Sequence, residues 1–383
     1  MKKNLLRVAV VVIILSMCFS CVVFAGESKI KVGIVADVGG RGDRSFNDSA
    51  LHGLEAWAGK VEYVRGGGYR TLSDAEYEAS IPDDLKGKDI HPLNVTPVVL
   101  ESKAQEDYIP NFIVLTEQEK CDLVVGVGFM QASAVGEVAK SYPDTKFVLV
   151  DAIPVDNEGN PLELDNVLSA LYSEHECGFL AGAIAGYATK SGKLGYIGGI
   201  KVPAVLKYEA GYRAGIKTTN PEAVIIGQYV ESFNEPTLGK MAAITQIGQG
   251  CDVIFHAAGA VGNGMFQAIC EKGAPYWAIG VDVDQGLDPH LCSDRTLTCA
   301  MKHVDYSVYL GIKALVEDGW EGGSKMMSLK DGGVTYAQDH VADVLTQEQI
   351  DKVEHLREMI IAGEIQVPNY PKYVDDWIPP TDF

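Results

Sequence analysis

The sequence lacks the short motifs that mark the common classes of enzyme. It has no GxxxxGK[ST] phosphate-binding loop and no G-x-S-x-G nucleophile elbow. Gly126 and Gly128 follow an apolar run, but the third glycine of a dinucleotide-binding fingerprint is missing after them. No group of residues has the spacing of a catalytic centre. We therefore expect a protein that is not an enzyme and that uses no cofactor.

Basic residues and metal-binding patterns are scarce as well. Lys and Arg number 32 against 52 Asp and Glu, and this formal net charge of −20 argues against a nucleic acid as partner. The cysteines form no C-x-x-C pair and the histidines are scattered, so no zinc signature is present. Asp282 and Asp284 have no further ligand at suitable spacing, so they predict no metal site.

Cysteine is infrequent in this sequence. Of the eight cysteines, Cys18 and Cys21 lie in the first 25 residues and the other six come later. Cys292 and Cys299 are near enough in sequence to form a disulfide across a short loop. The alternative for most of the six is a small buried thiol.

The sequence has one apolar run typical of a targeting segment, in its first 25 residues. A basic start precedes Val8 to Leu15, and Val23-Phe24-Ala25 suits cleavage, so residues 1–25 are predicted to be a secretory signal peptide. Cys21 is alternatively a site of lipid attachment, although the residues before it make a poor lipobox. No later segment approaches the ~18 apolar residues needed to cross a bilayer. We expect an extracytoplasmic protein, in the periplasm or at the outer face of the cell membrane.

The order of apolar and polar segments predicts an α/β protein. At roughly 100–200 residues per domain, 383 residues suggest two domains. Short apolar strands alternate with helical segments from Lys31 to Val150 and again from Val167 to Asp318, which favours two doubly wound parallel sheets. A TIM barrel is the alternative, but more strands are predicted than its eight. Val61 to Pro97 has no period and is expected to be an insertion or a long loop.

The stretch from Lys31 to Trp57 organises the first domain. Val32 to Ala36 predicts a buried strand, and a polar, glycine-rich loop follows it. Ser45 and Asp48 have the S-x-x-D spacing of a helix-capping box. Phe46 lies between polar residues in this loop, so it is either a hydrophobic staple under the helix or a platform that faces a ligand.

Polar residues or glycine follow four of the predicted strands. They are Asp37, Asp151, Gly259 and Asp282. In open parallel sheets, ligands bind beyond the carboxyl ends of the strands, so these residues converge if two sheets face each other across a cleft. Asp282 is suited to accept hydrogen bonds from hydroxyl groups. Lys302 either balances the charge of Asp282 or is a solvated lysine at the start of a helix.

Nine short motifs, in the right order, together resemble the BMP (basic membrane protein) family, whose members bind purine nucleosides for ABC importers. The motifs span Lys31 to about Gln338. They are Asp37-Val-Gly-Gly-Arg-Gly-Asp43-Arg-Ser45-Phe46-Asn47, Gly126-Val-Gly-Phe129, Phe147-Val-Leu-Val-Asp151, Glu176-Cys-Gly-Phe-Leu-Ala-Gly182, Tyr208-Glu-Ala-Gly-Tyr212, Ser232-Phe233-Asn234, Ala257-Ala-Gly-Ala-Val-Gly-Asn263-Gly, Ile279-Gly-Val-Asp282-Val-Asp284-Gln285 and Lys302-His-Val-Asp305.

The resemblance implies a type I periplasmic-binding-protein fold, in which two α/β lobes are joined by crossing segments and enclose a ligand cleft. We expect an N-terminal lobe of residues 29–152 plus about 283–318, with the insertion at about 61–97. The C-terminal lobe is then expected to comprise residues 153–282 plus about 325–383.

The resemblance also implies roles for individual residues. Phe46 and Phe233 would hold a nucleobase between their rings, and stacking of a base on an aromatic ring contributes ~1–3 kcal/mol. Asp282 would bind the ribose hydroxyls, beside Lys302 and the backbone of Gly259. The full set of expected ligand-binding residues is Asp37, Phe46, Asn47, Asp151, Phe233, Gly259, Asp282 and Lys302.

The sequence departs from the family pattern in three places. Family members often carry an acidic residue shortly after the Gly-Phe motif, where this chain has Ser133, with Gln131 nearby. Gly259 is followed by Ala-Val where Gly-Thr is common. These two departures leave the preferred base open, and residues 61–97 leave room for an altered cleft rim or a partner surface.

We therefore expect a monomeric solute-binding protein that captures a nucleoside, in particular a purine nucleoside. Hinge motion would close the lobes around the ligand, which would then pass to the permease of an ABC importer. Two alternatives remain. One is a receptor or sensor for another small molecule on the same fold. The other is a secreted nucleoside hydrolase, which would need a clustered carboxylate and metal site that the sequence does not display.

Overall fold

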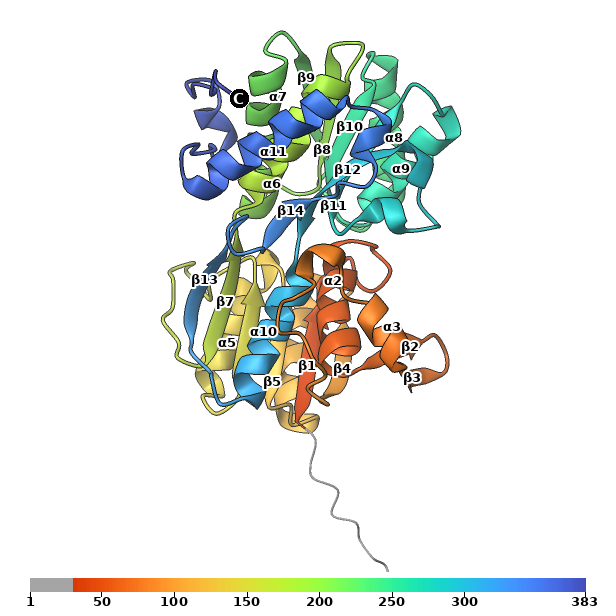
Figure 1. The fold of residues 1–383 in the computed structure, drawn as a ribbon. Coiled ribbons are helices and arrows are strands. Elements are labelled where there is room, and N and C mark those ends of the chain that lie inside the picture. Colours follow the sequence, from red (N-terminus) through yellow and green to blue (C-terminus); the bar gives the residue numbers. More distant parts are fainter. Residues whose placement is uncertain (1–29) are drawn as a thin grey trace, which may run out of the picture.

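The computed structural model describes residues 30–383, which form two α/β lobes, one above the other in Figure 1. The predicted signal peptide and the candidate lipidation site Cys21 lie outside the described residues. Each lobe is built on a six-stranded sheet. Among residues 30–383, no helix has both the length and the apolar character that crossing a membrane requires.

The sheet of the first lobe, the lower one in Figure 1, is entirely parallel, with the strand order β13-β7-β6-β5-β1-β4. Its strands are β1 (Lys31–Ala36), β4 (Thr96–Glu101), β5 (Leu123–Val127), β6 (Lys146–Val150), β7 (Val167–Tyr172) and β13 (Gly323–Met327). The predicted strand near Lys31 is thus confirmed as β1. Strand β1 pairs on both edges, which explains why a continuous apolar run was needed there.

Helices cover both faces of this sheet. One face carries α2 (Phe46–His52), its π-helical continuation η1 (Gly53–Ala58) and α10 (Val304–Val316). The other carries α4 (Tyr108–Ile113) with η4 (Val114–Gln118), and α5 (Ala132–Ser141). Short 3-10 turns, η3 (Gln105–Asp107) and η5 (Phe129–Gln131), precede α4 and α5.

The sheet of the second lobe has the order β14-β12-β11-β10-β8-β9 and is parallel except for β14. Its strands are β8 (Lys193–Gly198), β9 (Val224–Tyr229), β10 (Val253–Ala257), β11 (Trp277–Asp282), β12 (Thr296–Lys302) and β14 (Val334–Tyr336). Two doubly wound sheets, rather than a barrel, therefore confirm the predicted fold class.

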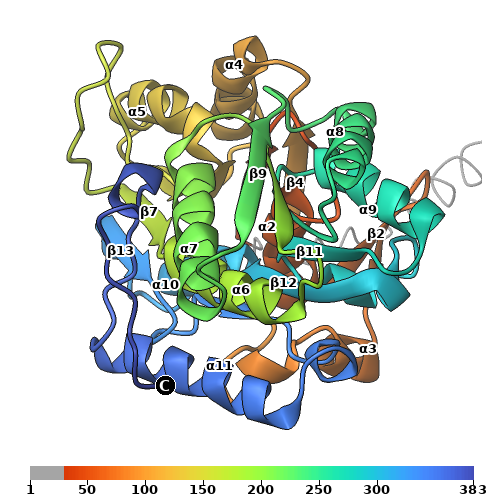
Figure 2. The same ribbon diagram turned by 90° about the horizontal axis from the view of Figure 1, so that it is seen from above.

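Five helices flank the second sheet, and Figure 2 shows α7 and α8 on opposite sides of β9. They are α6 (Glu174–Ala188), α7 (Pro203–Thr219), α8 (Pro236–Gly248), α9 (Val261–Lys272) and α11 (Gln347–Ala362). Helices α6 and α7 approach closely at Gly182, where an added Cβ would lie 2.2 Å from the carbonyl oxygen of Tyr212. Short turns complete the lobe: η6 (Gln285–Leu287), η7 (Ser293–Arg295), η8 (Val341–Asp343) and η9 (Pro371–Tyr373).

The chain crosses between the lobes three times: from β7 to α6, from β12 to α10 and from β13 to β14. This pairing corrects the lobe boundaries taken from the sequence. Residues 167–172 pair with β6 of the first sheet rather than joining the second lobe, and residues 296–302 pair with β11 of the second sheet. Residues 323–327 also belong to the first sheet. The order of strands in the sequence does not show where the chain crosses between the lobes. A strand belongs to the lobe whose sheet it pairs with, and that pairing cannot be read from sequence order.

Residues 61–97 are ordered, which corrects the expectation of a long loop. They form the hairpin of β2 (Val61–Val64) and β3 (Gly68–Thr71), the helix α3 (Asp74–Ala79) and the turn η2 (Asp83–Leu85), followed by the start of β4. The hairpin is exposed along nearly its whole length. Its residues therefore show no alternation of apolar and polar side chains, which is the signal that predicts a strand.

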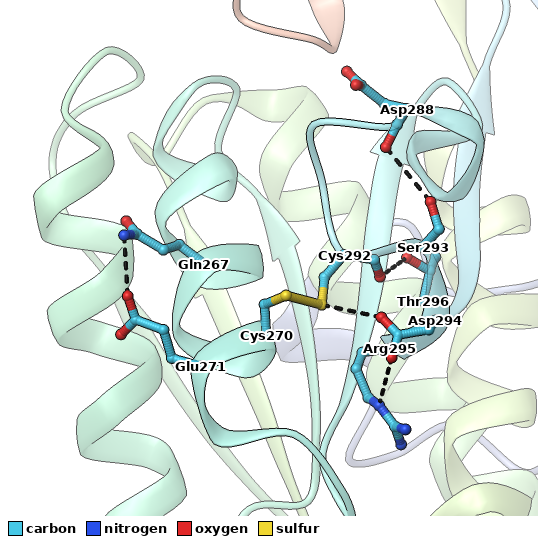
Figure 3. The surroundings of a disulfide bond; sticks show 9 residues. All are labelled: Gln267, Cys270, Glu271, Asp288, Cys292, Ser293, Asp294, Arg295 and Thr296. Carbon is cyan, nitrogen blue, oxygen red and sulfur yellow. Dashed lines mark hydrogen bonds and ion pairs between the residues drawn. A yellow bond between two sulfur atoms is a disulfide. The ribbon is translucent and has the colours of Figure 1, made fainter.

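The described residues contain one disulfide, between Cys270 of α9 and Cys292, with 5.5 Å between their Cα atoms (Figure 3). The suggested pair of Cys292 and Cys299 is therefore wrong. Cys299 is held inside β12, and its thiol contacts the Asp284 carboxylate at 3.7 Å. The remaining cysteines of the described chain, Cys121, Cys177, Cys251 and Cys299, are buried free thiols, as the alternative proposed.

Candidate ligand-binding site

A pocket of about 650 Å³, including the part open to solvent, lies between the two lobes. Its walls come from the carboxyl ends of strands in both sheets, as expected for parallel sheets that face each other. All eight residues singled out in the sequence line it: Asp37, Phe46, Asn47, Asp151, Phe233, Gly259, Asp282 and Lys302. The structure thus brings the whole predicted set to one place.

Asp37 is fixed at the end of β1 by its own neighbours. Its backbone N–H donates to Asn47 Oδ1 at 2.8 Å, and its Oδ1 accepts from the Val38 N–H and the Tyr108 hydroxyl. Burial raises the pKa of Asp37, although the Tyr108 hydrogen bond opposes this. No residue of the described chain donates to Oδ2, so this oxygen is available to a donor in the pocket.

Asn47 holds the loop together from within. Its Nδ2 donates to Asp43 Oδ2 at 2.9 Å while its Oδ1 accepts from Asp37, which leaves the second Nδ2 hydrogen without a partner among the described residues. The Asp43 carboxylate also accepts from the backbone N–H groups of Ser45, Asn47 and Asp48. Asp43 therefore caps α2.

The predicted capping box of Ser45 and Asp48 is wrong. Asp48 accepts from the N–H groups of Gly42 and Arg44, at 2.8 and 2.9 Å, and Ser45 makes no capping hydrogen bond. The Ser45 hydroxyl donates instead to Asp282 Oδ2 of the other lobe at 2.5 Å. Asp43, two residues before Ser45, caps the helix instead, and the Ser45 hydroxyl is therefore free to donate to Asp282.

Asp282 is buried at the end of β11, with a φ of 66°. Besides the hydrogen bond from Ser45, its Oδ1 accepts from the Tyr208 hydroxyl at 3.3 Å and lies 3.9 Å from Lys302 Nζ. Burial raises the pKa of Asp282, while the Lys302 ammonium and the Ser45 hydrogen bond act in the opposite direction. Asp282 is thus a carboxylate positioned by both lobes.

Lys302 is buried at the centre of three carboxylates, which excludes the reading of a solvated lysine. Its Nζ lies 2.7 Å from Asp151 Oδ2, 3.7 Å from Glu174 Oε1 and 3.9 Å from Asp282 Oδ1. Burial alone would lower the pKa of Lys302, but the three carboxylates raise it above its ordinary value. The ammonium therefore stays charged and links the two lobes.

Asp151 offers the pocket a buried acceptor without a partner. Its Oδ2 accepts from Lys302, while its Oδ1 has no hydrogen-bond donor among the described residues. Burial raises the pKa of Asp151, although Lys302 opposes this. A buried acceptor left unpaired costs about 1–3 kcal/mol, so a donor on a ligand would relieve that cost.

The two phenylalanines of the predicted base site both line the pocket. Lys302 Nζ lies 4.6 Å from the centroid of the Phe46 ring, a cation–π distance. The Phe233 ring is packed over Gly199, where an added Cβ would come within 2.3 Å of it. Phe46 also packs against the hydrophobic core of its lobe. It can therefore serve both as a hydrophobic staple and as a platform for a ligand.

Sequence reasoning missed four residues that shape the site. Glu174 accepts from Lys207 at 2.9 Å beside Lys302, and Tyr208 and Ser45 donate to Asp282. Tyr108 donates to Asp37. Tyr208 and Ser45 lie inside motifs that the resemblance rested on, which was the signal for them. Glu174 and Tyr108 had none, because each acts through a partner far away in the sequence.

The first departure from the family pattern falls outside the pocket lining. Gln131 is buried and its Nε2 donates to the carbonyl oxygens of Val35 and Val127, at 3.1 and 3.2 Å. Ser133 lies 3.4 Å from Asn157 Oδ1. Phe129 and Met130 form the pocket wall in that region instead.

This arrangement can bind a ligand that has one flat apolar part and several hydroxyl or amino groups. Aromatic rings offer faces for stacking, and carboxylate oxygens accept hydrogen bonds from hydroxyls. Two parallel-sheet lobes, three crossings and a pocket between the lobes together define a type I periplasmic-binding protein.

The chain belongs to the family described as Bmp, ABC transporter substrate-binding protein PnrA-like, whose profile matches residues 30–370. It is a family of solute-binding proteins. The chain is 32% identical over 357 residues to the CD4+ T-cell-stimulating antigen of Listeria monocytogenes, covering 89% of this chain and 88% of that protein.

A second relative carries a functional name. The ABC transporter nucleoside-binding protein BmpA of Lactococcus lactis is 31% identical over 361 residues, which is 90% of each chain. Among solved structures, an ABC transporter solute-binding protein from Aeropyrum pernix superimposes with a TM-score of 0.72 at 26% identity, covering 91% of this chain and 96% of that one.

Proposed function

We propose that this protein binds a purine nucleoside outside the cytoplasm and delivers it to the permease of an ABC importer. The base lies between Phe46 and Phe233, and the ribose hydroxyls meet Asp282, with Lys302 and the Gly259 backbone beside it. Asp37 and Asn47 contribute from the first lobe. The observation that carries the proposal is that two aromatic side chains and a carboxylate oxygen without a donor, Asp151 Oδ1, line the same interlobe pocket.

The polar groups of the pocket favour a ribose. A carboxylate accepts from two adjacent hydroxyls at once, and Asp151 Oδ1 is a buried acceptor that needs a donor. A site built to bond a hydroxyl rejects an analogue that lacks it, by up to roughly 10⁴-fold. The relative named as a nucleoside-binding protein supports the same ligand class for this chain.

Capture and release follow from the crossings. Closure of the lobes about the three crossing segments buries the ligand, and opening presents it to the permease. No covalent step is needed.

A thermal-shift screen of the chain from Gly26 onward tests the proposal. Purine and pyrimidine nucleosides, deoxynucleosides, free bases and ribose are compared, after any carried-over ligand has been removed by unfolding and refolding. A ligand at a hundredfold excess over Kd stabilises the folded state by ~2.7 kcal/mol. We expect that shift with adenosine, guanosine or inosine, and a weaker one with their deoxy forms.

Two variants assign the roles. Phe46→Ala removes a stacking face, so we expect affinity to fall by about tenfold or more, and Asp282→Ala should abolish the preference for ribose. Tyr373→Ala, an exposed aromatic in η9 outside the pocket, is the matched control and should bind as the wild type does. A folded protein that responds to no nucleoside but to another small molecule would reject the proposal and favour a receptor for that molecule.

A further inference from the structure

The lobes touch through a second group of contacts, formed by residues 43–45 of the first lobe and 263–288 of the second. Arg44 Nη1 lies 2.6 Å from Asp288 Oδ2, and Gln285 Nε2 donates to the Arg44 carbonyl oxygen at 3.0 Å. The Asn263 side chain donates to the Asp43 carbonyl at 3.4 Å. None of these residues belongs to a crossing segment, so the contacts depend on how the lobes face each other.

We propose that these residues form a clasp that holds the lobes closed, and that Ser45 is a positioning residue that orients Asp282 toward the ligand. The clasp is defined as Asp43, Arg44 and Ser45 together with Asn263, Asp282, Gln285 and Asp288. The role of Ser45 rests on the nucleoside function proposed above, whereas the clasp does not.

Arg44 is built for this contact. Its φ of 58° places it in the left-handed region, which is uncommon and unfavourable for a residue with a side chain. Asp48 holds that conformation by accepting from the Arg44 N–H at 2.9 Å. In this conformation the carbonyl and the guanidinium of Arg44 both meet one short segment of the other lobe.

The partner segment is equally fixed. Gln285 is buried, and its Oε1 accepts from the Val281 N–H at 3.0 Å and pairs with His256 Nε2 at 2.9 Å. These two contacts hold the amide so that its Nε2 points at Arg44. Val281 directly precedes Asp282, so the clasp and the ligand carboxylate lie on the same strand end.

The disulfide braces this segment from the far side. Cys292 ties residues 283–292 to α9 through Cys270, and Ser293 Oγ lies 3.5 Å from the Asp288 carbonyl oxygen (Figure 3). The loop that carries Asp288 is therefore held against its own lobe. Because the loop is fixed to its lobe, the ion pair of Arg44 with Asp288 holds the second lobe as a whole, not the loop alone.

Ser45 couples the clasp to the ligand. Its hydroxyl comes from the first lobe and donates to Asp282 Oδ2 of the second lobe, while Tyr208 occupies Oδ1 from within the second lobe. The two donors fix the plane of the carboxylate. Because the Ser45 hydrogen bond forms only when the lobes meet, closure sets the orientation in which Asp282 accepts from the ligand.

The experiment compares the full chain without its signal segment as wild type, Asp288→Asn and Ser45→Ala. Asp294→Asn is the matched control: Asp294 lies in η7, directly after the braced loop, and pairs with Arg295 of its own lobe. X-ray scattering without nucleoside reports the closure of the lobes. Stopped-flow kinetics and competition with guanosine and 2′-deoxyguanosine report binding, and thermal unfolding shows that each variant is folded.

We expect Asp288→Asn to increase the radius of gyration and to raise the dissociation rate of guanosine by about fivefold, with the association rate nearly unchanged. Ser45→Ala should reduce the preference for guanosine over 2′-deoxyguanosine by about tenfold, an effect that general destabilisation would not cause. Asp294→Asn should match the wild type in both measurements.

The outcomes separate the two proposals. If the wild type binds no nucleoside, the proposed function fails. The radius of gyration of the ligand-free variants, measured by X-ray scattering, still tests the clasp. If Asp288→Asn scatters like the wild type and like Asp294→Asn, the clasp is overturned. If guanosine binds but folded Ser45→Ala keeps the full preference for ribose, the positioning role of Ser45 is overturned while the proposed function stands.

Discussion

Gly128 lines the pocket on the first lobe, close to two predicted ligand-binding side chains. Its φ is 110°, a conformation that residues with a side chain rarely adopt. An added Cβ would lie 3.0 Å from Asp37 Oδ2 and 3.3 Å from Phe46 Cε1. The glycine therefore lets the backbone approach two predicted ligand-binding side chains at once.

Gly128→Ala tests this requirement. We expect the free energy of unfolding to fall by about 1–2 kcal/mol, because alanine is strained at this φ. We also expect weaker nucleoside binding, because the methyl group displaces Asp37 and Phe46. Gly159→Ala is the control, since its φ of 84° is also unfavourable for alanine and no atom lies within 4 Å of the added Cβ. Equal losses of affinity in both variants, measured by titration calorimetry, would contradict the proposed contact.

At the scale of residues, the sequence predicted which residues lie at the pocket better than it predicted their hydrogen-bond partners. Asp37, Asp151 and Asp282 were found because each follows an apolar strand, and the topology then brings them together. The hydrogen bond from Ser45 to Asp282 joins residues 237 positions apart. No local pattern records such a pair, so the spacing to Asp48 suggested a capping box instead.

At the scale of elements, the segment from α9 to β12 carries the charged residues of the second lobe's site, Asp282 and Lys302. It contains β11 with Asp282, the clasp residues Gln285 and Asp288, and the disulfide of Cys270 and Cys292. The sequence predicted these strands and helices because their apolar runs are buried. It did not predict the disulfide, since the partner is set by how α9 packs beside the loop rather than by sequence distance.

Removal of the disulfide should destabilise this segment. Closing a loop of 22 residues contributes about 3 kcal/mol through the entropy of the unfolded chain. We expect Cys270→Ser with Cys292→Ser to lower the free energy of unfolding by up to about that amount in urea titrations. A thiol reductant should lower the wild-type value similarly and leave the double variant unchanged. Peptide mapping that joins Cys292 to Cys299 would contradict the pairing.

At the scale of the whole molecule, residues 61–97 are tied to the crossings. His303 follows Lys302 where the chain enters the first lobe, and its N–H donates to the Gly333 carbonyl of a second crossing at 2.9 Å. Asp84 of η2 lies 2.7 Å from His303 Nε2. Residues 61–97, which the sequence predicted to be an insertion or a long loop, therefore contact the junction of the lobes through Asp84.

The charge state of His303 gives this junction a pH dependence. Burial alone would lower the pKa of His303, but Asp305 and Asp84 raise it to about 10. Asp305 is itself shared with His52, at 3.8 Å. Because the folded pKa exceeds the unfolded value of ~6.5, the stabilisation is complete below pH ~6.5 and is lost as the pH rises towards 10.

We expect the free energy of unfolding of the wild type to fall by about 2 kcal/mol between pH 6.5 and 9.5, a value reduced for the partly exposed Asp84. Asp84→Asn removes one carboxylate from His303, so its free energy of unfolding should change less over the same range. Asp83→Asn is the matched control, because Asp83 lies in the same turn and pairs with Lys86 on the surface. Urea titrations at a series of pH values compare the three proteins. Parallel curves for the wild type and Asp84→Asn would show that this ion pair does not stabilise the junction of the lobes.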